Sequence, residues 1–321
     1  SFGRALQNVG PFLFELTPSP ASYIVQKGKH LSDPKRNAAI WYAADAFDPK
    51  SKGINGRRVA GESFLRGFFK HVDADEFQGI VQGVNAGKQF QDLAAPYANG
   101  RSVRTFQSYL DAGVNGPSTI NYPAPNLKAE AWRRYHFGQS AFSICGITHT
   151  TATGTIMNAM FDLRTAPVEE WDGIICTSKA VLSQVNYQFD LFDDYADRRF
   201  GCAKPARPQT ALIPLGIHTD EFVTTKEQRA SLRSELDIGD EDIVFLTLSR
   251  LSANEKFDPL PMYQALQRAA EQTRKVLHLI LCGYFKDDLS KSVFVDGAKT
   301  LMPDVKLHFL DGRVSENPGK A

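Results

Sequence analysis

Three groups of residues in this chain have types and spacings that could carry chemistry. The most informative is Arg250 with Lys256, in the segment SRLSANEKF, where Arg250 closes an apolar run and Lys256 follows six residues later. Two cations at the carboxyl end of a parallel strand can hold a diphosphate and stabilise the charge that grows on it as a leaving group. The alternative is an ordinary solvated arginine and lysine in a surface loop.

His149 is the second candidate, in CGITHTTATG directly after the apolar run Phe142–Ile147. Open α/β sheets bind their ligands at the carboxyl ends of parallel strands. A histidine at such an end can hydrogen-bond a substrate hydroxyl or phosphate, whereas the alternative is a structural or solvent-exposed loop histidine. We expect His71, His278 and His308 in helix or strand interiors instead.

The third group is a glycine-containing segment, KGINGRRVAGESFLRGFFKH from Lys52 to His71, with Gly56, Arg57 and Gly61 before an amphipathic helix. Such a loop lets backbone N–H groups approach an anion. Its spacing is neither G-x-G-x-x-G nor a P-loop, so a plain strand-to-helix turn stays open. A membrane-surface helix is a further alternative, with an apolar face made of Phe64, Leu65, Phe68 and Phe69.

The hydrophobic pattern predicts the scaffold that these residues need. From about Ala38, short apolar runs alternate with helix-like segments, which is typical of a parallel α/β sheet covered on both faces. The expected strands are Ala38–Phe47, Phe142–Ile147, Gly173–Ser178, Thr210–Pro214, Ile243–Leu251, Val276–Tyr284 and Val305–Leu310. The expected helices include Gly61–Phe69, Ser178–Gln188, Pro259–Arg274 and Asp288–Leu301.

A turn near Ile213–Phe222 divides the pattern into two Rossmann-like lobes, which fits a length of 321 residues. The first lobe covers residues 1–217 and the second covers residues 218–321. Three strands are expected in the second lobe, where a doubly wound sheet has about five or six, so we expect this lobe to be incomplete.

Composition excludes several other classes. Hydrophobic residues make up 42% and charged residues 23%, as in soluble globular proteins, and a net charge of +1 argues against a general nucleic-acid-binding face. No apolar run approaches the ~20 residues of a membrane span. Cys145, Cys176 and Cys282 lie in apolar runs, so we expect buried thiols in a reducing cytoplasm. No cysteine or histidine spacing predicts structural zinc.

Taken together, the segments resemble a glycosyltransferase of the GT-B fold, family 4, whose retaining enzymes move a sugar from a nucleotide-sugar to an acceptor. The resemblance covers most of the chain from about Ala38 and is most specific in Ile174–Val181, Ile213–Phe222, residues 226–260 and Leu277–Tyr284. It implies that Arg250 and Lys256 bind the donor diphosphate. It also implies that Gly56–Gly61, with Arg57, is a substrate-binding loop and that His149 is a catalytic residue.

The resemblance further implies a nucleotide-diphosphate sugar as co-substrate, with no cofactor and no metal, so the D-A-D sequence at Asp73–Asp75 is interpreted as a turn. The donor is expected between the lobes. The acceptor, which is a sugar, a lipid or another hydroxyl compound, is expected to bind the first lobe. The protein is expected in the cytoplasm, and peripheral contact with the inner face of a membrane is an open alternative.

One family feature is missing. The family's Glu-x7-Glu segment comes later in the second lobe, and Glu227 and Glu235 are expected on a polar helix ahead of that lobe's first strand, where they cannot replace it. The chain is therefore expected to be a fragment that could be inactive alone. A non-catalytic nucleotide-sugar or partner-binding half-protein and a GT-B sugar-nucleotide epimerase remain alternatives, whereas a dehydrogenase is disfavoured by the missing G-x-G-x-x-G.

Overall fold

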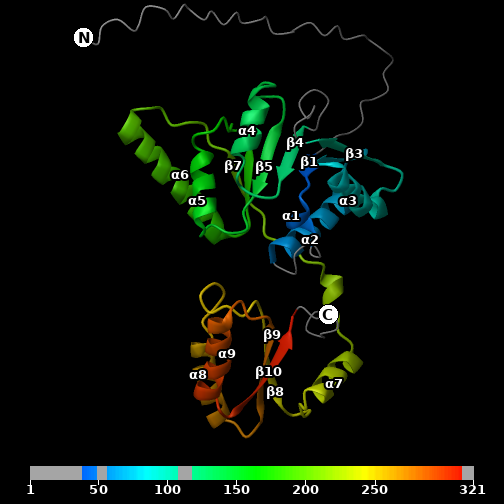
Figure 1. Cartoon of the computed structure of the whole chain (residues 1–321), viewed down its shortest axis with the longest axis vertical. Coiled ribbons are helices and arrows are strands. Elements are labelled where there is room, and N and C mark those ends of the chain that lie inside the picture. Colours follow the sequence, from blue (N-terminus) through cyan, green and yellow to red (C-terminus); the bar gives the residue numbers. More distant parts are fainter. Residues whose placement is uncertain (1–37, 49–55, 108–117, 313–321) are drawn as a thin grey trace, which may run out of the picture. The chain divides into compact units, whose positions relative to one another are not determined.

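The computed structural model describes residues 38–48, 56–107 and 118–312, and within them the chain forms two parallel β-sheets (Figure 1). The first sheet has seven strands in the order β3-β2-β1-β4-β5-β6-β7, and the second has three in the order β10-β9-β8. Every strand pair is parallel. The expected α/β fold with two Rossmann-like parallel sheets is confirmed.

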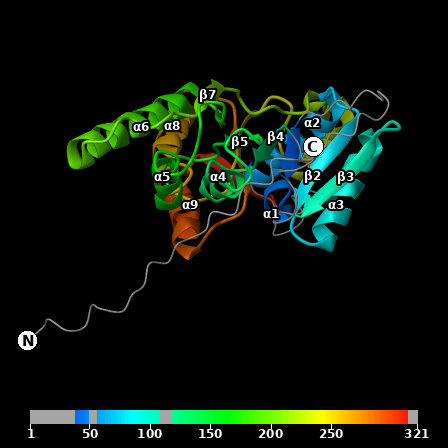
Figure 2. The same ribbon diagram turned by 90° about the horizontal axis from the view of Figure 1, so that it is seen from above.

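The first sheet and its helices extend from Ala38 to Leu212. Its strands are β1 (Ala38–Trp41), β2 (Glu76–Val81), β3 (Ser102–Gln107), β4 (Thr119–Tyr122), β5 (Ser143–Ile147), β6 (Gly173–Cys176) and β7 (Gln209–Leu212). Its helices are α1 (Ala44–Phe47), α2 (Gly56–His71), α3 (Val84–Ala94), the 3₁₀ turn η1 (Ala95–Tyr97), α4 (Lys128–Tyr135), α5 (Gly154–Asp162) and α6 (Lys179–Phe200). Figures 1 and 2 show α3 alongside β2 and β3, and α5 beside α6.

The second sheet is smaller and has its own core. Its strands are β8 (Ile243–Leu248), β9 (Leu277–Gly283) and β10 (Val305–Asp311). The accompanying helices are η2 (Thr219–Phe222), α7 (Lys226–Glu235), α8 (Leu260–Glu271) and α9 (Asp288–Leu301). Tyr263 of α8 and Phe294 of α9 are fully buried, and the Tyr263 hydroxyl donates a hydrogen bond of 2.9 Å to the Phe294 carbonyl. This bond ties the two helices together over the sheet.

Several expected elements differ in extent from the observed ones. The expected strand Ala38–Phe47 is wrong in its second half, because β1 ends at Trp41 and α1 follows. The strands β2, β3 and β4 were not expected. Helix α6 begins after Ser178, whose side chain caps the first turn by accepting from Val181 N. It runs well past its expected end at Gln188 and ends at the C-cap residue Gly201, which has a left-handed φ of 61°.

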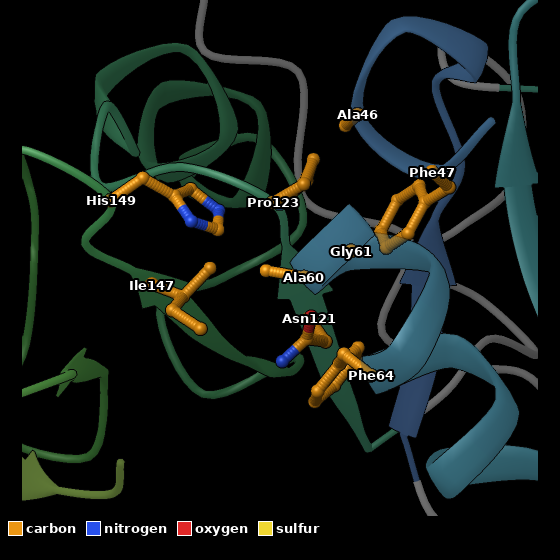
Figure 3. Close-up of a pocket in the computed structure, with 9 residues that line it drawn as sticks. All are labelled: Ala46, Phe47, Ala60, Gly61, Phe64, Asn121, Pro123, Ile147 and His149. Atoms are coloured by element: carbon orange, nitrogen blue, oxygen red, sulfur yellow. The ribbon is translucent and has the colours of Figure 1, made fainter. Parts of the chain in front are cut away.

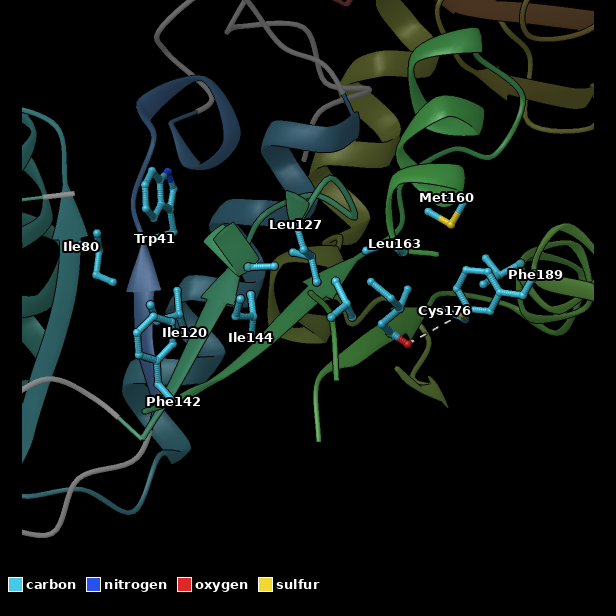
Figure 4. Close-up of a cluster of buried hydrophobic side chains, with 14 of the residues drawn as sticks. Trp41, Ile80, Ile120, Leu127, Phe142, Ile144, Met160, Leu163, Cys176 and Phe189 are labelled. Carbon is cyan, nitrogen blue, oxygen red and sulfur yellow. Dashed lines mark hydrogen bonds between the residues drawn. The ribbon is translucent and has the colours of Figure 1, made fainter. Parts of the chain in front are cut away.

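Two apolar cores pack on opposite faces of the first sheet, because successive residues of a strand point to opposite faces. On β1, Ala39 and Trp41 join the core under α4, α5 and α6 (Figure 4). Ile40 of β1 and Tyr42, the residue directly after it, join the core under α1, α2 and α3. Both cores are closed to solvent. The central strands are therefore covered on both faces, as in other parallel sheets, whereas the edge strands β3 and β7 are more exposed.

A fully buried ion pair joins α4 to the amino ends of three strands. Both guanidinium Nη atoms of Arg134 donate to Asp172, at 2.5 and 2.7 Å, and both side chains have no exposed surface. The Asp172 carboxylate also accepts from the Ile144 and Glu169 backbone N–H groups at 2.8 Å. Its backbone carbonyl accepts from Gln209 N at 2.7 Å, so β5, β6 and β7 all begin beside this pair.

Among the described helices, none combines the length and the apolar composition needed to cross a bilayer.

We predict that Asp172→Asn destabilises the fold by about 3–5 kcal/mol, because it leaves the Arg134 charge buried without its counter-ion. Urea unfolding followed by circular dichroism measures this. The matched control is Asp194→Asn, which removes an exposed ion pair to Lys204 at 3.7 Å and is expected to cost less than about 1 kcal/mol. Equal effects of the two substitutions would contradict the special role of Asp172.

Candidate functional site

A pocket opens where the strand order of the first sheet reverses. The strands β1 and β4 are neighbours, but the chain continues from β1 towards β2 and β3 on one side and from β4 towards β5, β6 and β7 on the other. Ligands of open α/β sheets bind beyond the carboxyl ends at such a reversal. Figure 3 shows the lining residues, which are Ala46, Phe47, Ala60, Gly61, Phe64, Asn121, Pro123, Ile147 and His149.

His149 lies two residues beyond the end of β5 and turns its ring towards Pro123 (Figure 3). The ring donates a hydrogen bond to the Pro123 backbone carbonyl. Burial lowers the pKa of His149 below its usual 6.5, the Arg57 charge lowers it further, and the hydrogen bond opposes both. The imidazole is therefore neutral at pH 7. One nitrogen donates to Pro123, so the other can accept a hydrogen bond.

The prediction that Gly56–Gly61 forms a loop ahead of the helix is wrong, because α2 already begins at Gly56. Gly56, Arg57 and Gly61 therefore belong to the first two turns of a helix. The Arg57 Nη1 atom lies 3.8 Å from the Asp45 carboxylate, and its charge acts on His149. Gly56 faces open space. The structure thus brings Arg57 and Gly61 to the His149 pocket, while Lys52 and Gly53 lie outside the described residues.

Gly61 has a packing role that its type explains. A Cβ atom at this position would lie 2.0 Å from the Ala46 carbonyl oxygen, so only glycine lets α2 approach α1 this closely. On the same helix Leu65 and Phe69 are buried, and Phe64 and Phe68 pack against the same core. The apolar face of α2 thus packs into the core of the first sheet.

Sequence analysis missed a buried carboxylate near the same edge. Glu130 of α4 forms an ion pair with Arg133 at 2.7 Å, and its side chain is only 3% exposed. Burial raises the pKa of Glu130 to about 7, although Arg133 lowers it. Glu130 in turn raises the pKa of Tyr122, after the larger effect of burial. No motif predicts Glu130, because a charged residue in a short helix is usually exposed, whereas this one lies on the buried face of α4 with Ala131 and Arg134.

The second sheet carries Arg250 and Lys256, as predicted, just beyond the carboxyl end of β8. Arg250 Nη2 donates to the Glu255 carboxylate at 2.7 Å, and its Nε is buried without a hydrogen-bond partner. Lys256 is exposed, and its backbone N–H donates to Ser252 O at 3.0 Å. The hydrogen bond from Lys286 and the charges of Arg250 and Lys256 all lower the pKa of Glu255. Arg250 therefore pairs with Glu255, whereas Lys256 acts on the same carboxylate through its charge alone.

Glu255 and Lys286 belong to the same edge and were not predicted. Lys286 follows β9 and donates from Nζ to the other oxygen of Glu255. A Cβ atom at Gly283 would lie 1.8 Å from the Ser249 carbonyl oxygen, so the ends of β8 and β9 are in close backbone contact. Lys286 could have been found by the rule that identified Arg250, a cation directly after a buried strand.

The other titratable groups of the second sheet form a separate chain near its amino end. His278 Nε2 lies 3.1 Å from Asp242 Oδ2, and its Nδ1 lies 2.9 Å from His308 Nε2. Both histidines are in strand interiors, as expected. Across the described ranges, no group of three or more His, Cys, Asp or Glu side chains is arranged to hold a metal ion. All four cysteines of the chain lie in described segments and are free thiols.

No protein-family model and no curated protein matches the chain. Two solved structures that it resembles are of HepE from Anabaena. The complex of HepE with UDP has 13% sequence identity and a TM-score of 0.48, over 87% of this chain and 70% of HepE. The complex with UDP and glucose has the same identity and TM-score, over 86% of this chain and 69% of HepE.

We predict that Gly61→Ala destabilises the protein by about 1–3 kcal/mol, because the new methyl group collides with the α1 backbone. Gly67→Ala on the same helix is the matched control. A Cβ atom at Gly67 meets nothing within 4 Å, so alanine should stabilise the helix by about 0.5–1 kcal/mol. The midpoint temperature of thermal unfolding should fall for Gly61→Ala and rise for Gly67→Ala. A change in the same direction for both variants would contradict the close approach of α1 and α2.

We also predict that NMR titration gives His149 a pKa below 6.5, and that Arg57→Gln raises it. With the lower pKa in the folded wild-type protein, His149 binds a proton more readily in the unfolded chain. Its contribution to stability is therefore complete above pH 6.5 and is lost as the pH falls through the folded-state pKa. Arg198→Gln, at the far end of α6, should leave the His149 pKa unchanged. A value at or above 6.5 in the wild type would be inconsistent with the buried ring.

Proposed function

We propose that this chain is a glycosyltransferase of the GT-B fold, similar to family 4, that transfers a sugar from a nucleoside-diphosphate sugar to an acceptor hydroxyl. Transfer proceeds with retention and without a metal. Residues 218–321 form the donor side and residues 1–217 form the acceptor side. The observation that carries the proposal is the position of Arg250 and Lys256 beyond the carboxyl end of the parallel strand β8, where Arg250 donates to Glu255 and the Lys256 charge acts on the same carboxylate.

The charge at this edge suits a diphosphate leaving group. When the bond between the sugar carbon and the diphosphate oxygen breaks, its electron pair stays on the diphosphate. Fixed cations lower the barrier by stabilising that growing charge. Arg250 presents a planar fork that can contact two phosphate oxygens, and Lys256 adds a mobile point charge. The nucleotide-sugar is a co-substrate in this scheme, so no resident cofactor takes part in the step.

The pocket of the first sheet has a volume of only about 10 Å³, so it suits one group of the sugar or of the acceptor rather than the whole molecule. Phe47, Phe64 and Ile147 provide apolar walls, and Asn121 and His149 provide polar groups. A few polar groups in an apolar pocket are typical of small-molecule sites. The neutral His149 ring can accept a hydrogen bond from a ligand hydroxyl while remaining uncharged. A lipid acceptor would bring the protein to the inner face of a membrane.

Two other functions use the same cations. A non-catalytic nucleotide-sugar-binding half-protein would bind the donor and leave it intact, and a GT-B epimerase would change the sugar of the donor without an acceptor. The reaction products distinguish the transferase, the binding protein and the epimerase. Proton NMR of a reaction with donor and acceptor shows whether nucleoside diphosphate is released, whether the anomeric configuration is retained and whether the donor sugar is epimerised.

We predict that Arg250→Ala and Lys256→Ala each weaken binding of UDP, GDP or ADP by about tenfold or more, since each removes a charge-assisted contact to the diphosphate. Isothermal titration calorimetry on the full chain measures this, and EDTA should change nothing. The control is Lys275→Ala, which breaks an exposed pair with Glu241 at 3.0 Å near the other end of the sheet. Unchanged affinity in the Arg250 variant would remove the donor-site assignment.

A further inference from the structure

The Glu255 carboxylate bridges two cations that come from different strand ends. Its Oε2 accepts from Arg250 Nη2 at 2.7 Å, and its Oε1 accepts from Lys286 Nζ. Arg250 follows β8 and Lys286 follows β9, so the bridge spans the ends of neighbouring strands. Each carboxylate oxygen has its own cation. The carboxylate thus presents two oxygens on one central atom, each to a different cation. A phosphate group in the same place could present two of its oxygens in the same way.

The backbone fixes the separation of the two cations. Beyond β8, Leu251 N donates to Tyr284 O at 2.9 Å, and Lys286 N donates to Leu251 O at 3.3 Å. The close approach of Gly283 to Ser249 lies directly before these bonds. Arg250 and Lys286 are therefore held by a paired backbone rather than by two independent loops. A ligand that replaces Glu255 meets both cations already in position.

The bridge is accessible and replaceable. The exposed fractions of the Arg250, Glu255 and Lys286 side chains are 34%, 40% and 44%, so an anion from solvent can reach all three. Exposed ion pairs contribute little to stability, so breaking this one costs the fold little. Among Arg250, Lys256, Lys286 and Glu255, the single carboxylate leaves two positive charges unbalanced. The buried Nε of Arg250 is a further donor without a partner.

Neighbouring acidic residues are held mainly by other partners, although the Lys286 charge adds to the Ser290 hydrogen bonds in lowering the pKa of Asp287. Asp287 Oδ1 accepts from Ser290 N at 2.7 Å at the start of α9, and Asp258 Oδ1 accepts from Leu260 N at 3.0 Å at the start of α8. Both carboxylates are engaged by helix N-termini. Glu255 is the carboxylate whose two oxygens face these two cations.

We propose that Lys286 is a third cation of the diphosphate site and that Glu255 is an internal counter-ion, which the diphosphate of the donor displaces from Arg250 and Lys286. This inference rests on the proposed function and deepens its donor site. It assigns opposite effects to two residues that form one ion pair: Lys286 strengthens diphosphate binding, and Glu255 weakens it by competing for the same cations.

The test is calorimetric titration of the full chain with inorganic pyrophosphate and with UDP. Lys286→Ala should weaken both by about five- to tenfold, as loss of a charge-assisted contact does. Glu255→Gln keeps the size of the side chain and removes its charge, and it should tighten both by about threefold, because the cations are then unoccupied before binding. Lys299→Ala, near the end of α9, is the charge-matched control and should have no effect.

The outcomes separate this inference from the function on which it rests. If Arg250→Ala and Lys256→Ala weaken binding while Lys286→Ala does not, the third cation is excluded and the donor site stands. If Glu255→Gln weakens binding, its carboxylate supports the ligand or the loop, and the role of internal counter-ion is excluded. If the wild-type chain binds neither pyrophosphate nor UDP, both proposals are overturned. Thermal unfolding of each variant checks that a loss of binding does not reflect a loss of folding.

Discussion

The buried pair of Arg134 and Asp172 is the constraint on which the first sheet depends. A charge without solvent must be fully paired, and here the carboxylate receives two guanidinium and two backbone donors. Because the pair lies where β5 and β6 begin and meets the first residue of β7, it sets the register of these strands. Parallel strands of fixed register end at fixed positions. The pair therefore determines from the far edge of the sheet where His149 emerges.

In the second sheet, the ends of the strands are held in position by close backbone contacts rather than by a buried ion pair. Gly283 meets Ser249, and a Cβ atom on Gly312 would lie 3.2 Å from Gly283 Cα, so the chain is tightly packed where β8, β9 and β10 end. Side chains at these positions would push the loops apart. Small residues at the carboxyl edge thus hold the loops that carry Arg250 and Lys286, while the charged side chains themselves remain in solvent and free to exchange partners.

Unbroken apolar runs predicted β5 to β10 closely, although only β9 is buried along nearly its whole length, and β7 and β8 leave most of their residues exposed. The same rule missed β2, which includes Gln78 and Gly79, and β3, where polar and apolar residues alternate. Arg250, Lys256 and His149 could be found because each follows a strand. Glu255 could not, since its role depends on the pairing of β8 with β9. The glycine segment misled because Gly61 serves the contact of two helices rather than a loop.

The pocket at the strand reversal draws its walls from elements that belong to different cores. Phe47 and Phe64 are held by the core under α1, α2 and α3, whereas β4 and β5, which carry Asn121 and Ile147, are anchored by Ile120 and Ile144 in the core on the opposite face. The pocket exists only when both cores have formed. A molecule that fills the pocket binds the folded chain but not the unfolded chain, and it therefore stabilises the fold by mass action. Because the pocket needs both cores, a bound molecule couples the folding of one core to the folding of the other.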